Sequence, residues 1–465
     1  MANLNRFRLL RTKQPVQSIP TTAGSIFAVI YDNYLVEANG PARWSVFGHR
    51  PERHSAVLIA GLGIATVRWL PYEREIRLRH PQARGGTGPM SDHLSIDSRS
   101  RPDDHAVKMV ARGALMLEVM NRLARAYAGR RILVTGGASF IGSHLTELLV
   151  QSGGKVTVAD DLSSGRRGNL DTIASSITLL EGDLRCPDFA AAALGGQEVV
   201  FHLAASHGGR GYIDTHPIEC LNNMMLDHVV FAAAADAGVR KIVLASSACT
   251  YPTNLQIDEN SRLLLQEGDA NFEEPGKAFA DGEYGWAKLM GEFQLRAFYK
   301  QKGISGVACR IFTAYGEREN ESHAVIALIA KAAARLDPFP IWGDGLQTRN
   351  FTYVQDTVTG MALGGAVLDG FEVINVGTET HYTILDLLEE IFRVVDWRPK
   401  VIEKQLDKPV GVKSRAADIS KCREKLGWVP SYTLREGVER TTTWYLNAFG
   451  RRDAQTLEHL LMERN

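Results

Sequence analysis

The chain has 465 residues, enough for two or three domains at about 150 residues per domain. Lysine plus arginine and aspartate plus glutamate number 53 each, so the charge balance favours neither a nucleic-acid nor a membrane partner. The five cysteines lack metal-site spacing, and we find neither a secretory signal nor an apolar run that could span a bilayer, which favours a reducing cytoplasm and free thiols.

Residues 1–128 differ in composition from the rest of the chain. Two segments, 25–38 and 55–70, are rich in β-branched and aromatic residues, which predicts strands. A polar stretch rich in Arg, Pro and Gly follows and predicts a loop, and apolar residues at helical spacing predict a helix over 106–127. We find no chemical motif here. The segment is either a small added domain or the product of an upstream start, with Met116 or Met120 opening the working protein.

From residue 129 the chain alternates between predicted strands and helices. This alternation predicts an α/β fold, a Rossmann-type doubly wound parallel sheet over 129–316. Residues 317–450 are expected to form mainly a smaller α/β lobe over the carboxyl edge of the sheet, and 451–465 a helical tail. Clear strand candidates carry the sequences RRILVTG, KVTVADD, EVVFHLAA, RKIVLASSA and SGVACRIF.

A glycine-rich turn joins the first of these strands to its helix, in TGGASFIGSHL. Such a turn places backbone N–H groups and a helix N-terminus where a dinucleotide pyrophosphate binds. Gly136 permits the tight turn and Gly142 permits close helix packing, whereas Ser139 occupies the position usually held by a middle glycine. The candidate contacts in this turn are Gly136, Ser139, Phe140, Ile141 and Gly142.

Asp160 ends the second strand, where a carboxylate accepts hydrogen bonds from ribose hydroxyls and repels a 2′-phosphate. It therefore favours NAD as cofactor over NADP, although Arg166 and Arg167 could hold a 2′-phosphate. Asp183 and Leu184 follow another strand. There Asp183 could bond the adenine amino group or cap a helix.

Tyr284 and Lys288, in YGWAK, lie one helical turn apart and so share a face. Tyrosine titrates near ~10 in water, so an ammonium group and a positive nicotinamide would be needed to make it a base at neutral pH. Ser247 stands at the end of a predicted parallel strand, where ligands bind in such sheets. The three residues predict an oxidoreductive site.

Together these segments resemble the extended short-chain dehydrogenase/reductase family that modifies nucleotide sugars. The resemblance covers roughly residues 130–445 and rests on TGGASFIGSHL, HLAA, SSACTYP, YGWAK and WGDGLQTRNFTYVQD. It implies an NAD-dependent cytoplasmic enzyme that forms a homodimer, with Ser247, Tyr284 and Lys288 as its triad.

Within that family, HGGRGYI, SSACTYP and GVKSRAADISKCREKLGW most resemble the GDP-mannose 3,5-epimerases. This likeness implies a GDP-sugar substrate and a transient 4-keto sugar. Cys249 matches the catalytic cysteine of GDP-sugar enzymes, and His323 falls where the 3,5-epimerases carry lysine and GDP-fucose synthases carry histidine. The resemblance thus implies a Cys249/His323 acid–base pair for inversion at C3 or C5.

The same resemblance assigns substrate contacts. Glycines would let the chain pass close to the sugar, and arginines can bond a diphosphate in two places. The candidates are Gly208, Gly209, Arg210, Asn223, Arg349 and Arg415. No metal is expected. Thr313 and Glu317 depart from the usual asparagine and proline of the family, which leaves the nucleotide open.

Other functions remain possible on sequence grounds. A UDP-sugar 4-epimerase would need the triad alone. A non-catalytic NAD-binding scaffold would be expected to lose triad members, which are all present. A 4,6-dehydratase would need acidic residues where Ala248 and Cys249 stand, and an NADPH-dependent reductase is disfavoured by Asp160.

Overall fold

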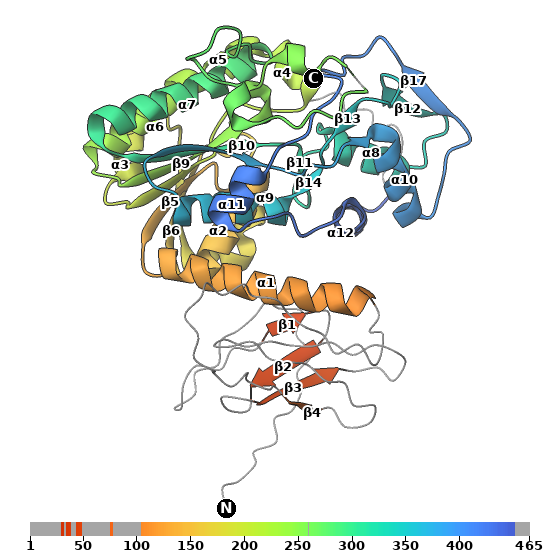
Figure 1. Cartoon of the computed structure of the whole chain (residues 1–465), viewed down its shortest axis with the longest axis horizontal. Coiled ribbons are helices and arrows are strands. Elements are labelled where there is room, and N and C mark those ends of the chain that lie inside the picture. Colours follow the sequence, from red (N-terminus) through yellow and green to blue (C-terminus); the bar gives the residue numbers. More distant parts are fainter. Residues whose placement is uncertain are drawn as a thin grey trace, which may run out of the picture. The chain divides into compact units, whose positions relative to one another are not determined.

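The computed structural model describes residues 29–31, 34–38, 43–48, 75–77, 104–258 and 260–451 (Figure 1). The chain divides into two compact units, Met1–Glu118 and Val119–Asn465, each considered by itself below. The predicted strand at 55–70 lies outside the described residues, as does the predicted tail beyond residue 451.

The first unit contains a four-stranded antiparallel sheet in the order β1-β2-β3-β4. The first two strands lie in the segment 25–38, which was predicted as one strand and forms two strands that pair antiparallel with each other. The fourth strand lies in the stretch that was predicted as a loop, so the loop prediction is wrong at that strand. Its short sequence, Glu-Ile-Arg, has little strand propensity and is held by pairing with β3. The strands are β1 (Val29–Tyr31), β2 (Tyr34–Ala38), β3 (Arg43–Gly48) and β4 (Glu75–Arg77).

Helix α1 (Asp104–Tyr127) confirms the helix predicted over 106–127. Its last turns belong to the second unit, because Leu123 and Tyr127 are buried in the core of that unit. The Tyr127 hydroxyl donates to the carbonyl oxygen of Ala362 at 2.7 Å, and Arg122 donates to that of Leu426 at 2.7 Å. The second unit therefore begins before the boundary expected near residue 129.

The second unit is built on a seven-stranded parallel sheet in the order β15-β10-β9-β8-β5-β6-β7, which confirms the predicted Rossmann-type fold. The order reverses between β5 and β8, and in such sheets the crevice at the reversal binds ligands. The strands are β5 (Arg131–Thr135), β6 (Lys155–Asp160), β7 (Ile177–Glu181), β8 (Val199–His202), β9 (Lys241–Ser247), β10 (Ser305–Ile311) and β15 (Phe371–Val376).

Two hydrophobic clusters cover the two faces of this sheet. Strand β5 shows the alternation that separates them, since Ile132 and Val134 face one cluster and Leu133 the other. The first cluster includes residues of α1, α2 (Phe140–Gln151) and α9 (Val354–Val367), and the second includes residues of α3 (Pro187–Leu194), α6 (Asn223–Asp236) and α7 (Gly282–Lys302). Both faces are thus covered by helices, as a parallel sheet requires.

Shorter elements form a lobe beside the carboxyl ends of these strands (Figure 1). Its small sheets pair β11 (Ala314–Tyr315) with β14 (Thr352–Tyr353), β12 (Phe339–Trp342) with β17 (Ile402–Gln405), and β13 (Thr348–Arg349) with β16 (Tyr382–Thr383). Its helices are α8 (Ala324–Ala333), α10 (Ile384–Val395) and α12 (Leu434–Phe449). Strand β15 and α9 return to the main sheet, so residues 317–450 serve both parts. Short helices α4 (Arg210–Thr215), α5 (Pro217–Leu221) and α11 (Ser420–Leu426) complete the unit.

Candidate active site

The turn between β5 and α2 has the shape that a pyrophosphate site needs. Gly136 has φ +67°, and a Cβ there would lie 2.8 Å from the backbone nitrogen of Ala204. A Cβ on Gly142 would collide with the carbonyl oxygen of Gly136. Ser139 is the N-cap of α2, and its hydroxyl donates to the Gly136 carbonyl oxygen at 2.5 Å. The serine side chain is thereby folded back onto the turn.

A cavity of about 340 Å³ opens beside this turn, lined by Gly136, Asp160, Asp183 and Leu184 among others. Asp160 is buried, and its carboxylate accepts hydrogen bonds from the backbone N–H groups of Ala138 at 2.8 Å and Leu162 at 2.9 Å. Burial raises the pKa of Asp160, while these two bonds lower it. The carboxylate thus organises the turn and still borders the cavity.

Two other predicted residues in this cavity are already hydrogen-bonded. Asp183 accepts from the backbone N–H of Arg185 at 2.8 Å and pairs with its guanidinium. Asn223 is buried, and its amide bonds both the N–H and the carbonyl oxygen of Ser206. Asn223 lines this smaller cavity, and its two hydrogen bonds hold the chain after β8.

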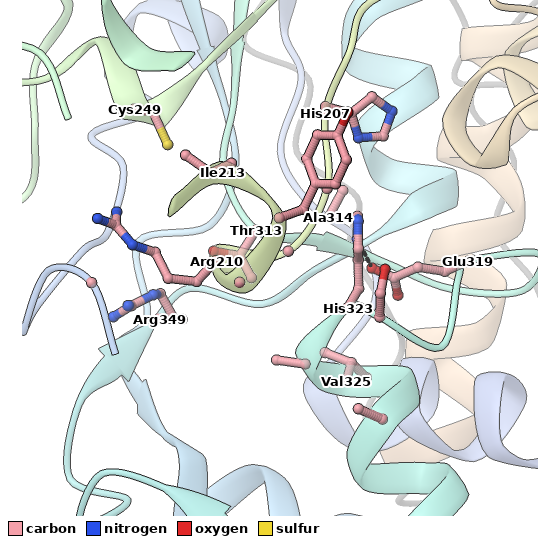
Figure 2. Close-up of a pocket in the computed structure, with 18 of the residues that line it drawn as sticks. His207, Arg210, Ile213, Cys249, Thr313, Ala314, Glu319, His323, Val325 and Arg349 are labelled. Carbon is pink, nitrogen blue, oxygen red and sulfur yellow. Dashed lines mark hydrogen bonds and ion pairs between the residues drawn. The ribbon is translucent and has the colours of Figure 1, made fainter. Parts of the chain in front are cut away.

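A larger cavity of about 800 Å³ gathers the residues predicted for catalysis (Figure 2). The catalytic candidates come from three separate segments of the chain, the end of β9 with the turn after it, the start of α7, and the start of α8. Its lining includes Ser247, Cys249, Tyr284, Lys288, His323, Gly208, Gly209, Arg210, Arg349 and Arg415.

The predicted triad occupies the floor of this cavity where β9 ends and α7 begins. Lys288 is buried, with Nζ 5.9 Å from the centre of the Tyr284 ring. Burial, followed by the thiols of Cys249 and Cys220, raises the pKa of Tyr284, whereas a hydrogen bond with Ser247 lowers it. Burial also lowers the pKa of Lys288. The protein alone therefore holds Tyr284 as a neutral phenol, which must lose its own proton before it can accept one.

Cys249 lies in the 3-10 turn that follows β9. Its backbone N–H donates to the Ser247 hydroxyl at 3.1 Å, and Nη1 of Arg415 lies 3.4 Å from its sulfur. A Cβ on Gly285 would collide with the Cys249 carbonyl oxygen, so the start of α7 packs tightly on this turn. This packing places Cys249 beside the triad.

His323 is the N-cap residue of α8 and faces the cavity from the other side in the view of Figure 2. Its Nδ1 lies 2.9 Å from Oε1 of Glu319, a buried carboxylate whose pKa is raised by burial and lowered by His323. Glu319 also lines the cavity, and the sequence analysis did not select it. The structure thus pairs the histidine with an acid from its own loop.

Three arginines converge around Asp281, another residue that the sequence analysis missed. Asp281 accepts from Arg210 at 2.9 Å and from Arg415 at 3.1 Å, and the charges of Arg415 and Arg210 hold its pKa below the ordinary value although burial works the other way. Arg349 donates to two backbone carbonyl oxygens. Burial and the nearby Arg415 lower the pKa of Arg349 to about 10. The cluster is a strongly positive part of the cavity.

The glycine loop before α4 packs against the loop that carries His323. A Cβ on Gly209 would lie 2.5 Å from the carbonyl oxygen of Ser322, and one on Gly208 would lie 2.5 Å from Cβ of Tyr212. The predicted reason for these glycines was close approach to a sugar. For Gly209 the structure gives a second reason, which is the contact between the two loops, and for Gly208 it gives the contact with Tyr212 of α4.

Residues 132–377, more than half of the chain, match the family described as the NAD dependent epimerase/dehydratase family. The chain belongs to the NAD dependent epimerase/dehydratase family. Its relatives include the GDP-mannose 3,5-epimerase 1 of Oryza sativa subsp. japonica, which is 33% identical over 319 residues, covering 68% of this chain and 81% of that protein.

Solved structures agree with this membership in the epimerase/dehydratase family. UDP-glucose 4-epimerase of Thermotoga maritima with UDP-glucose has a TM-score of 0.61 at 26% identity and covers 68% of this chain and 99% of its own. The dTDP-glucose 4,6-dehydratase of Streptomyces venezuelae with NAD bound has a TM-score of 0.62 at 25% identity. The match covers 69% of this chain and 98% of the dehydratase chain.

NAD is the cofactor of this epimerase/dehydratase, and the smaller cavity fits it. Gly136 and Gly142 allow the tight turn that borders this cavity, because a Cβ at either position would collide with the backbone, and the buried Asp160 disfavours a 2′-phosphate. Among the described residues, no cluster of His, Cys, Asp and Glu could hold a metal ion, and no helix is long and apolar enough to cross a membrane.

Proposed function

We propose that the enzyme inverts C3 or C5 of a nucleotide-diphosphate sugar, with a GDP-sugar favoured, through a transient 4-keto sugar. The observation that carries this proposal is the meeting of two residue sets in one cavity of about 800 Å³. The triad Ser247, Tyr284 and Lys288 suits oxidation and reduction at C4. The pair Cys249 and His323 suits proton exchange on the neighbouring carbons.

The triad moves one proton at the C4 hydroxyl. The chemistry that bound NAD would supply here is acceptance of hydride from C4 and its later return. As the phenolate, after its own proton has been lost, Tyr284 takes the hydroxyl proton as the carbonyl forms and gives it back as the carbonyl is reduced. Lys288, with its positive charge, stabilises the phenolate, and Ser247 hydrogen-bonds the reacting oxygen.

A 4-keto group makes the hydrogens on C3 and C5 acidic. Inversion needs one group to remove a proton from one face of the ring and another to deliver a proton to the other face. In the view of Figure 2, Cys249 and His323 lie on opposite sides of the cavity, and this arrangement supports the proposal.

The arginine cluster supports a diphosphate substrate. Arg210, Arg349 and Arg415 border the same cavity, and planar guanidinium groups bond phosphate oxygens in two places. The relative named as a GDP-mannose 3,5-epimerase favours a guanosine nucleotide, whereas the structural neighbour with UDP-glucose favours a uridine nucleotide.

Proton NMR of GDP-mannose and UDP-glucose, each incubated with enzyme and NAD in deuterated water, tests the proposal. Deuterium at C3 or C5 of one sugar is expected. Turnover at C4 without any deuterium label would overturn the proposal and favour the second candidate, a UDP-sugar 4-epimerase. That candidate rests on the triad alone and on the similarity to UDP-glucose 4-epimerase.

Cys249→Ala is expected to slow deuterium incorporation at C3 or C5 by roughly 100- to 10,000-fold, because it removes one of the two acid–base groups. Oxidation at C4, followed through reduced cofactor, should continue. The control is Cys186→Ala, which removes an exposed thiol. Equal exchange in the Cys249 variant and the wild type would remove Cys249 from the mechanism.

Arg349→Gln is expected to raise KM for the nucleotide sugar by roughly tenfold to 100-fold, because the variant loses one charged hydrogen bond to phosphate. The value of kcat should change much less, because the contact is made in the ground state as well. Arg423→Gln, which removes an exposed arginine paired with Glu379, is the control. Steady-state kinetics that show a fall in kcat alone would contradict a binding role.

A cytoplasmic homodimer also remains part of the proposal. The five cysteines are free thiols, which suits a reducing compartment. Helices α5, α6 and α7 expose large apolar side chains of the kind found in subunit interfaces, namely Ile218, Met225, Trp286 and Phe293. A non-catalytic scaffold would need neither the triad nor the arginine cluster, so we do not favour it.

A further inference from the structure

Glu319 is hydrogen-bonded to His323, the histidine that the proposed function uses. The proposed mechanism itself gives Glu319 no role. We propose that Glu319 is a positioning residue that keeps a proton on Nδ1 of His323 and so leaves Nε2 as the nitrogen that exchanges protons with the sugar. The inference rests on the proposed function, because it concerns the acid–base step assigned there to His323.

The contact is short and protected from water. Oε1 of Glu319 lies 2.9 Å from Nδ1 of His323, as the dashed line in Figure 2 shows. The carboxylate side chain is 3% exposed, whereas the histidine side chain is 24% exposed and borders the cavity. A charge-assisted hydrogen bond in such surroundings is stronger than one in water, and it fixes the ring.

The chemistry of the two groups decides where the proton sits. An ionised carboxylate only accepts hydrogen bonds, so the ring nitrogen facing Glu319 must carry hydrogen. Neutral imidazole has one N–H, which leaves a lone pair on the other nitrogen. Nε2 is then a base that can take a proton from the sugar, and Glu319 stabilises the imidazolium that results.

His323 needs this negative charge because of its place in the fold. It is the N-cap of α8, where the N–H groups of the first turn create a positive potential that disfavours imidazolium. The first turn of α8 contains no acidic residue. The ring of His207 lies edge-on to His323, with centroids 6.0 Å apart, and adds no negative charge. The negative charge of Glu319 therefore offsets the positive potential at the N-terminus of α8.

A role in stabilising the fold explains the buried carboxylate of Glu319 less well than a role in positioning His323. Burying a carboxylate costs free energy unless the group is paired. Among the described residues, His323 is the one side chain that bonds Glu319, a backbone hydrogen bond from Gly316 adds to it, and Oε2 has no hydrogen-bond partner. Neighbouring Glu317 differs, since both of its oxygens accept from the hydroxyl of Tyr353.

Glu319→Gln tests the inference. The amide keeps the shape but can face either tautomer of the ring, and it supplies no charge. We expect deuterium incorporation at C3 or C5 to fall roughly tenfold or more. Formation of reduced cofactor by oxidation at C4 should stay within about twofold of the wild type, because Tyr284 carries that step. Glu424→Gln, which changes an exposed carboxylate of α11, is the matched control and should leave both rates unchanged.

Each outcome separates the inference from the function beneath it. If the wild type incorporates no deuterium at C3 or C5, the proposed function fails and the inference fails with it. If the wild type exchanges and Glu319→Gln exchanges equally fast, only the inference is overturned. An equal loss of both steps would mark Glu319 as merely structural and would also overturn it.

A second measurement needs no variant at position 319. Nitrogen-15 NMR of the resting wild-type enzyme reports which ring nitrogen of His323 carries hydrogen, with the signals identified by their loss in His323→Asn. We expect hydrogen on Nδ1. Hydrogen on Nε2 of the neutral ring would overturn the inference even if Glu319→Gln fails to fold.

Discussion

Tyr284→Phe is expected to reduce epimerisation by roughly 100- to 10,000-fold, the usual contribution of a positioned acid–base group. The variant keeps the ring, which lies near Lys288, and loses only the hydroxyl that exchanges a proton with the C4 oxygen. The two rates to measure are formation of the product sugar and formation of reduced cofactor. Both should fall together, because every later step depends on the 4-keto sugar.

The matched control is Tyr299→Phe, which removes an exposed hydroxyl from the same helix. It should behave like the wild type. The contrast with Cys249→Ala is informative, since that variant should still oxidise C4. If Tyr284→Phe oxidised C4 at the normal rate, another group would have to accept the proton, and the triad would lose its role.

Glu292→Gln is expected to lower the free energy of unfolding by about 3–5 kcal/mol, the usual cost of leaving one charge of a buried ion pair without its partner. Arg310 is 1% exposed and donates two hydrogen bonds to Glu292, at 2.9 and 2.8 Å. Its other bonds go to backbone carbonyl oxygens of Glu267 and Ala270. Ser246, beside the triad serine, also bonds Glu292.

Denaturant unfolding at neutral pH measures this loss, with Glu273→Gln as control. Glu273 pairs with Arg296 on the surface, and surface pairs contribute little because water and salt screen them. The control should unfold at nearly the wild-type denaturant concentration. Equal midpoints for the two variants would show that Arg310 does not depend on Glu292.

Much of the fold could be predicted because periodicity marks buried strands and helices directly. The strands that end at Thr135, Asp160 and Ser247 lie where the pattern placed them. The limit of the second unit could not be found this way. A helical pattern shows that 106–127 is a helix, but it does not show that Leu123 and Tyr127 pack into the core of the unit that follows.

The candidate site was predicted best where a motif carries the chemistry. Ser247, Tyr284 and Lys288 follow from strand ends and helical spacing, and the structure brings them together. Glu319 could not be selected, because it stands among other acids in GERENES and only the folded loop shows which one meets His323. Asp281 was missed for the same reason, since its partners come from distant segments.

The end of α1 changes how the catalytic unit should be delimited. The family match begins at residue 132, yet the core that supports it already includes Val119, Leu123 and Tyr127. Near the Tyr127 hydroxyl lies Gly365 of α9, where a Cβ would come within 2.7 Å of that oxygen. A fragment cut at the family boundary would lose the side chains that fill this space. Fragments intended for crystallisation or assay should therefore begin before Val119.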